Sequence, residues 1–152
     1  MVYNGIVKGM GNMKKLYANF TKEEKALLKQ IFKEINIKDV TIVNHARERM
    51  ESKGITESDI YNCLRSFDVI ELHQKDWDIR LLLRGRAKDT MGRNTCVSLS
   101  LITKRIITAY KNYSTDGHST LREEEYIDVD VKYKLEKVYQ KLIKKCLTIN
   151  FW

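Results

Sequence analysis

Proline is absent from this sequence of 152 residues, and glycine occurs only seven times. Turns must therefore come from glycine, asparagine and aspartate, without the fixed backbone angle that proline supplies. No apolar run approaches the roughly 18 residues that cross a bilayer. The N-terminal residues also lack the apolar stretch and the cleavage site of a signal peptide. We therefore expect a soluble, cytoplasmic protein with no membrane association.

Cysteine is scarce as well: Cys63, Cys96 and Cys146 lie far apart and form no C-x-x-C pair. Such an odd, scattered set supports neither a disulfide framework nor a zinc site, so we interpret these cysteines as core residues. The chain also lacks a Walker loop and the patterns G-x-G-x-x-G, H-E-x-x-H and G-x-S-x-G. We accordingly expect no metal and no nucleotide or flavin cofactor.

Positive charge is what the chain has in excess, with a net charge of +8 at pH 7. Residues 1–39 and 40–113 each carry four more basic than acidic residues, whereas residues 114–152 are balanced. A basic region of this kind favours a polyanionic partner, most simply RNA or DNA. The alternative is a lysine-rich surface that is only solvated.

One domain is expected from the length, and 43% hydrophobic residues are enough for a core. Residues 1–20 contain three of the seven glycines and are predicted to be a flexible segment before a single domain at residues 21–152. Thr21 and Glu24 form a capping-box pattern that opens the first helix. Its apolar side chains follow helical spacing: Leu27, Leu28, Ile31, Phe32 and Ile35.

Three further helices are predicted. One spans about residues 43–52 and is followed by Gly54, which suits the left-handed backbone angle at a helix end. The next begins at a capping pattern from Thr56 to Asp59. A final helix over residues 128–147 carries one apolar stripe, which is either core or a surface for a partner or a second copy. The stripe consists of Val131, Leu135, Val138 and Leu142.

Four strands are predicted before the final helix, at residues 67–72, 77–86, 95–102 and 105–113. The last two form a hairpin, for which we expect a turn at Thr103-Lys104. Helices, then an antiparallel meander, then a helix indicate an α+β fold. We predict N-terminal helices packed on a four-stranded antiparallel sheet, with an additional C-terminal amphipathic helix.

The most distinctive pattern is His45-Ala-Arg-Glu-Arg-Met50, followed by Gly54-Ile-Thr56 and then Asp59. It resembles the signature H-A-x-x-R-M-x-x-x-G-I-[ST]-x-x-D of a family of small bacterial and phage-borne domains related to the RelE and BrnT toxins. More broadly, that family is grouped with the barnase–EndoU–colicin–RelE ribonuclease fold. The resemblance covers roughly residues 40–113, a toxin-like core, and leaves the first helix and a helical extension at residues 120–152 outside it.

This resemblance implies a toxin-like, metal-independent endoribonuclease that cleaves RNA by attack of the 2′-OH and leaves a 2′,3′-cyclic phosphate. It also implies a paired antitoxin or immunity protein as partner. Members of the broad fold differ in their catalytic residues, and some bind rather than cleave. The alternative is therefore a non-catalytic phage or mobile-element regulator that reuses the fold to bind a protein or a nucleic acid.

One substitution and one truncation separate these hypotheses. Replacement of His45 stops an enzyme but leaves a regulator unchanged, whereas trimming residues 128–152 abolishes a regulator whose function lies in the terminal helices. A DNA-binding repressor is the third hypothesis. It needs base-reading side chains on a recognition helix, and the helix near Thr56 offers only Asn62 and Arg65.

RNA cleavage without a metal requires a base, an acid and a cation beside the phosphorus oxygens. His45 is our candidate for the base or the acid, because histidine titrates near neutral pH and the free N–H groups at a helix start favour phosphate. The alternative is that His45 caps the helix or packs against the sheet. His73 and His118 are predicted to lie in solvated loops.

Arg80, Arg84 and Arg86 share one strand face by the two-residue period. We interpret Arg80 and Arg84 as catalytic cations and Arg86 as an RNA-binding residue, because the guanidinium fork suits phosphate. The competing account is that these arginines pair with carboxylates, namely Asp78, Glu48 or Glu71.

The other RNA-binding candidates are Arg49, Lys88, Arg93 and Tyr110. Arg49 lies on nearly the same helix face as His45 and either holds phosphate or ties the helix to the sheet through a carboxylate. Lys88 and Arg93 belong to a basic loop.

Tyr110 ends the hairpin, where it is placed to stack on a base. The predicted turn, however, puts Tyr110 and Thr108 on the same face as Val97 and Leu99, which favours a core role for both.

Overall fold

The structure is a computed structural model that describes residues 12–113 and 126–150, with side chains as far as Lys144. The first eleven residues, residues 114–125 with His118, and the side chains of Cys146 and the last residues lie outside the described part. Within that part, no helix combines the length and the apolar composition of a membrane span.

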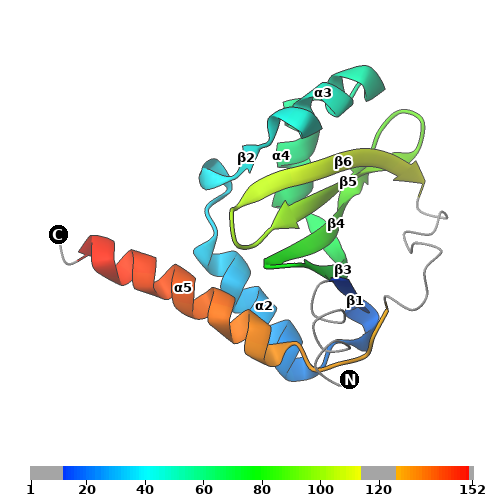
Figure 1. Ribbon diagram of the computed structural model, residues 1–152. Coiled ribbons are helices and arrows are strands. Elements are labelled where there is room, and N and C mark those ends of the chain that lie inside the picture. Colours follow the sequence, from blue (N-terminus) through cyan, green and yellow to red (C-terminus); the bar gives the residue numbers. More distant parts are fainter. Residues whose placement is uncertain (1–11, 114–125, 151–152) are drawn as a thin grey trace.

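The described residues form a six-stranded sheet and four α-helices (Figure 1). The helices are α2 (Lys22–Glu34), α3 (Asn44–Lys53), α4 (Glu57–Arg65) and α5 (Lys132–Asn150). The strands are β1 (Asn12–Leu16), β2 (Thr41–Ile42), β3 (Phe67–Lys75), β4 (Asp78–Lys88), β5 (Arg93–Ser100) and β6 (Arg105–Tyr113). Short 3-10 turns occupy Tyr17–Asn19 and Ile37–Asp39.

The strand order is β1-β3-β4-β5-β6-β2, and β2 pairs parallel with β6 while the other neighbours are antiparallel. The predicted α+β class is confirmed. The sheet, however, is six-stranded and mixed, not four-stranded and antiparallel. The four predicted strands form its centre, from β3 to β6. A strand as short as β2 shows no alternation along the sequence, so its pattern does not identify it.

β1 corrects the expectation that the whole of residues 1–20 is a flexible segment. Asn12–Leu16 pairs with β3, and Met13 and Lys15 are buried. The Lys15 ammonium donates to the Glu24 carboxylate at 3.0 Å. Two successive lysines concealed this strand, because a lysine is rarely buried unless a partner neutralises it.

The predicted helix ends are confirmed at three positions. The Thr21 hydroxyl accepts from the N–H of Glu24, whose carboxylate accepts in return from the N–H of Thr21. Thr56 and Asp59 make the same reciprocal pair at the start of α4. Gly54 ends α3 with φ at 71°, in the left-handed region.

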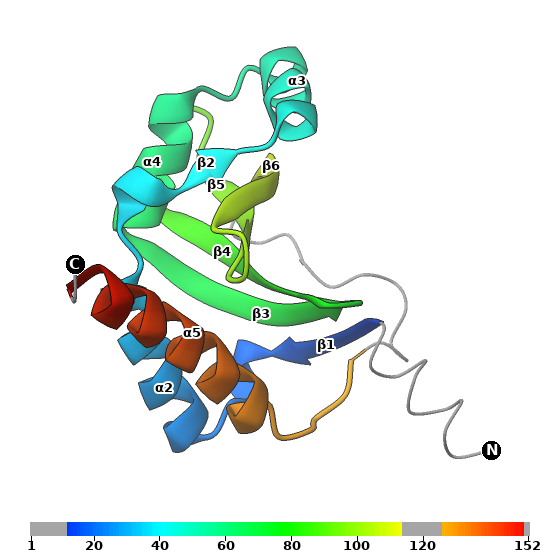
Figure 2. The same cartoon turned by 60° about the vertical axis from the view of Figure 1, so that its left-hand side comes forward.

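One face of the sheet carries the core. Figure 2 shows α2, α4 and α5 on the same side of the twisted sheet. Side chains such as Leu81, Leu83 and Val97 point to this side and are fully buried. The apolar stripe of α5 is no more than 6% exposed, so it is core and not a free surface for a partner. The opposite face of the sheet carries the side chains that alternate with these core residues, Arg80 and Arg84 among them.

Candidate nucleic-acid interface

The face of the sheet opposite the core, which we call the arginine face, is made of the side chains that alternate with the buried ones. On β4, Arg80 and Arg84 alternate with buried leucines. The cross-strand pairs then extend the same face over the neighbouring strands. Its members are Glu71, His73, Arg80, Leu82, Arg84, Cys96, Ser98, Ser100, Thr108 and Tyr110.

A β-bulge in the hairpin places Tyr110 on the arginine face. The register of β5 against β6 shifts by one residue at Leu99, so Tyr110 lies opposite Cys96. A slip of one residue reverses the face of every side chain beyond it. The expectation that Tyr110 and Thr108 share a face with Val97 is therefore wrong.

Arg80 is held in place by a buried carboxylate. Its Nε donates to Asp78 Oδ2 at 2.7 Å, and Ser100 Oγ donates to Asp78 Oδ1 at 2.6 Å. The predicted alternative of pairing with Asp78 is thus observed, but it uses only Nε. The two terminal amino groups of Arg80 have no acceptor within the described residues, so they are available to an anion.

His73 corrects another expectation. It was predicted in a solvated loop but lies on β3, directly opposite Arg80, and is half-buried. Its Nε2 lies 2.6 Å from Asn12 Oδ1 of β1. His73 therefore helps to join β1 to the sheet.

Arg84 belongs to a polar cluster in the middle of the arginine face. Cys96 and Tyr110 continue its row across β5 and β6. In the next row, the buried Glu71 carboxylate accepts from Tyr126 Oη at 2.9 Å. Burial raises the pKa of Tyr110 well above its usual 10, so its hydroxyl stays protonated at neutral pH. These buried and half-buried groups form the middle of the arginine face.

Both cysteines with described side chains are buried, as predicted: Cys63 packs in the core, and Cys96 lies on the arginine face. Cys63 and Cys96 are both buried and form no disulfide. Burial raises the pKa of Cys63 to about 12, and it also raises the pKa of Cys96 above its usual value. Neither thiol is ionised at neutral pH, so neither is a nucleophile. Among the described residues, no group of His, Cys, Asp and Glu side chains is arranged to hold a metal ion.

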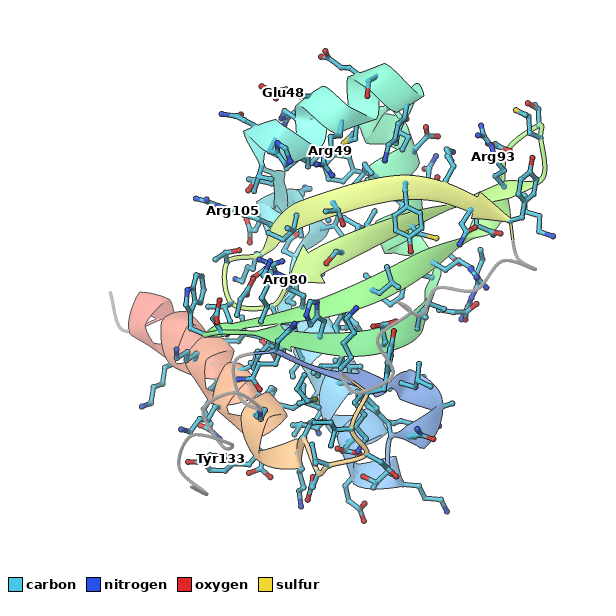
Figure 3. The ribbon with its side chains drawn as sticks, turned by 45° about the vertical axis from the view of Figure 1, so that its right-hand side comes forward. Glu48, Arg49, Arg80, Arg93, Arg105 and Tyr133 are labelled. Carbon is cyan, nitrogen blue, oxygen red and sulfur yellow. The ribbon has the colours of Figure 1, made fainter. Side chains whose placement is uncertain are left out.

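One side of helix α3 is turned toward the arginine face. Ala46 and Met50, one turn apart, are buried where α3 packs on β6. On one side of them, Arg47 pairs with a glutamate at the start of α4. Helical spacing puts His45 and Arg49 on the other side. Figure 3 shows Arg49 between α3 and β6, on the side of the arginine face.

Arg105 is a site residue that the sequence analysis missed. It begins β6 and precedes the buried Ile106, so alternation puts it on the arginine face. The N–H of Val43 donates to the carbonyl of Ile106 at 3.2 Å, which brings the start of α3 and His45 beside the start of β6. The alternating pattern of residues 105–113 is the signal that could have identified Arg105.

Four basic residues gather at this end of the sheet, and we call His45, Arg49, Arg80 and Arg105 the basic corner. His45, Arg49 and Arg105 are exposed, and their side chains have no ion-pair or hydrogen-bond partner within the described residues. Figure 3 shows Glu48 on the side of α3 away from the sheet. The predicted pairing of a sheet arginine with Glu48 is therefore not observed.

Arg86, Lys88 and Arg93, also predicted to bind RNA, lie at the other end of the sheet. Arg86 and Arg93 form ion pairs with Asp68 and Asp89 at 3.0 and 3.1 Å. A hydrogen bond from the Arg93 N–H is the largest cause that lowers the pKa of Asp89. Lys88 ends β4, about 25 Å along the strand from the basic corner. Figure 3 shows Arg93 at the far end from Arg80 and Arg105.

Comparison with known proteins locates the basic corner within one matched region. No match was found among the curated proteins or among the solved structures. The match to a family model leaves β1, α2 and α5 outside and covers just under half of the 152 residues. The matched family is described as "Domain of unknown function (DUF4258)", and residues 42–111, which match it, include all four residues of the basic corner.

Proposed function

We propose that this protein is a metal-independent endoribonuclease that binds RNA at the basic corner. The observation that carries the proposal is an exposed histidine grouped with three arginines, of which Arg49 and Arg105 have no counter-charge in the described residues. Guanidinium groups bind phosphate through paired N–H groups, and histidine exchanges protons near neutral pH. The resemblance of the segment from His45 to Asp59 to RelE-related domains supports the same class.

His45 acts as the general base in this proposal. It removes the proton from a ribose 2′-OH, whose oxygen attacks the neighbouring phosphorus. The bond from phosphorus to the 5′ oxygen breaks, which leaves a 2′,3′-cyclic phosphate on one fragment and, after protonation of the 5′ oxygen, a hydroxyl on the other. Arg49, one turn along α3 from His45, and Arg105, at the start of β6, stabilise the charge that develops on the phosphate.

Arg80 has a different role because it is farther from His45. It lies on β4, which is two strands and hence about 10 Å from β6, the strand that carries Arg105. Asp78 fixes its guanidinium through Nε, which leaves the terminal amino groups to bind an adjacent phosphate of the same strand.

The test is cleavage of total RNA and of ribosome-bound RNA by the purified protein in EDTA, with the ends of the fragments identified chemically. We expect 2′,3′-cyclic phosphate ends, and we expect His45→Ala to slow cleavage by at least about 100-fold, the usual size of general base catalysis. Lys88→Ala is the matched control, because this exposed cation lies at the other end of the sheet.

The outcomes separate an enzyme from a binding protein and test the role of His45. Wild-type protein that cuts neither substrate rules out the ribonuclease. Cutting that persists unchanged in His45→Ala removes His45 from the mechanism. RNA that is bound at the basic corner but never cut supports the non-catalytic regulator instead.

A further inference from the structure

A second surface lies away from the basic corner, along α5. A groove of about 280 Å³ runs between α5 and the hairpin of β3 and β4. An adjoining hollow of about 260 Å³, beside the turn between β5 and β6, shares Ile102, Val138 and Lys141 with it. We call the combined hollow the α5 groove. No residue of the basic corner lines it.

The α5 groove has an aliphatic floor and exposed aromatic edges. Ile79 and Val138 lie in the floor and are buried. Trp77 and Tyr133 line the same groove but are 70% and 66% exposed. Large exposed aromatic side chains beside an apolar hollow are typical of protein interfaces, where they act as rigid anchors.

The charge around the α5 groove has one sign. Among the described residues, no aspartate or glutamate lines it and four lysines do: Lys104, Lys134, Lys137 and Lys141. Burial lowers the pKa of Lys134, and a carboxylate placed beside its ammonium would raise that pKa again. The ammonium of Lys137 lies 4.7 Å from the centre of the Tyr133 ring, which keeps one cation beside an aromatic edge.

We propose that the α5 groove binds an acidic amphipathic segment of a protein partner. Apolar side chains of the segment fill the floor between Trp77 and Tyr133, and its carboxylates pair with the four lysines. A second copy of this chain fits poorly, because it brings like charges together. Single-stranded RNA also fits poorly, because the floor is aliphatic and lysine lacks the planar fork of arginine.

The side of the α5 groove that α5 forms lies outside the residues that match the family model. Tyr133, Lys134, Lys137 and Lys141 all lie on α5, outside residues 42–111. The partner site therefore depends on the helix that this chain adds to the matched region. Because the groove and the basic corner share no residue, binding of the segment and cleavage of RNA can be measured separately.

The experiment uses the full chain with Trp152→Phe, so that Trp77 is the single tryptophan. A displayed library of short random peptides is selected on this protein, and the tightest-binding peptide is synthesised and titrated. Because Trp77 lines the groove, a bound peptide moves its emission to shorter wavelength. We expect peptides rich in Asp and Glu with spaced Leu or Phe, and binding about tenfold weaker in K137E/K141E, which reverses two pairing charges.

The control variant is K29E/K33E, which makes the same change in charge on the exposed face of α2. Retained binding in this variant, with loss in K137E/K141E, supports the site. Equal weakening in both variants, selected peptides without acidic bias, or no peptide that shifts Trp77 emission overturns the proposal. A shift caused by an RNA oligonucleotide, and not by the acidic peptide, assigns the groove to nucleic acid instead.

Discussion

Glu24 is a single side chain that joins three elements. Its carboxylate accepts from the N–H groups of Thr21 and Val131, each at 2.7 Å, and from the Lys15 ammonium at 3.0 Å. It thereby caps α2, receives the first turn of α5 and neutralises the buried lysine of β1. Burial alone would raise the pKa of Glu24, but the hydrogen bonds outweigh burial and hold the pKa below its usual 4.5.

Replacement of Glu24 tests how much these contacts contribute to stability. We expect Glu24→Gln to lower the free energy of unfolding by about 3 kcal/mol, because it removes the buried counter-charge of the Lys15 ammonium and leaves only the exposed carboxylate of Asp128, 3.5 Å away. Urea unfolding measures the change. Glu23→Gln is the control, since Glu23 is exposed on the same turn. Similar losses in the two variants would contradict the role of Glu24.

Comparison of the wild type with Glu24→Gln also predicts how the stabilising contribution of Glu24 depends on pH. The pKa of Glu24 is lower in the folded chain than in the unfolded chain. Its stabilising contribution is therefore fully present above the unfolded pKa, near 4.5, and is lost as pH falls through the folded pKa. The difference in unfolding free energy between wild type and Glu24→Gln should narrow over that acidic range.

At the scale of the element, α3 shows how a local signal positions the site. Gly54 at φ 71° ends the helix, and Ala46 and Met50 fasten it to β6. These features fix the orientation of α3 on the sheet. They therefore also fix the side of the helix that carries His45 and Arg49.

Gly54→Ala isolates the contribution of the backbone at this end. An added methyl group meets nothing within 4 Å, so the cost comes only from the left-handed backbone angle. We expect a loss of about 1 kcal/mol in the free energy of unfolding. Thermal and urea unfolding measure it, with the exposed Lys53→Ala beside it as control. No loss at Gly54 would show that the αL conformation is not needed there.

At the scale of the whole molecule, α5 is part of the core. Val131 and Leu135 are completely buried, and α5 packs against α2. Trimming residues 128–152, considered above as a test for a regulator, therefore removes core side chains and destabilises the entire fold. The exposed lysines of α5 are the better targets, because their replacement leaves the core in place.

The distribution of charge predicts how RNA binding responds to salt. Each phosphate neutralised by a cation contributes about −0.7 to the slope of log affinity against log salt concentration for a single strand. We expect R49A/R105A to reduce the magnitude of that slope by about 1.4, the equivalent of two contacts. Fluorescence anisotropy of a labelled RNA measures it. An unchanged slope, or an equal reduction in K29A/K33A, would place the RNA elsewhere on the surface.

The sequence by itself determined the features that depend on residues close together in the chain. Capping boxes at Thr21 and Thr56, the left-handed end at Gly54 and the alternation along β4 were all readable, because each arises from contacts within a few residues. They were enough to establish the α+β class and to place the arginines on one face.

Only the tertiary structure decided which distant residues meet. β1 and β2 are held by partners elsewhere in the chain, so their own patterns did not reveal them. One bulge moved Tyr110 to the arginine face, and the pairing of β2 with β6 brought His45 beside Arg105. Register and edge pairing depend on contacts between residues far apart in sequence, and local periodicity does not contain that information.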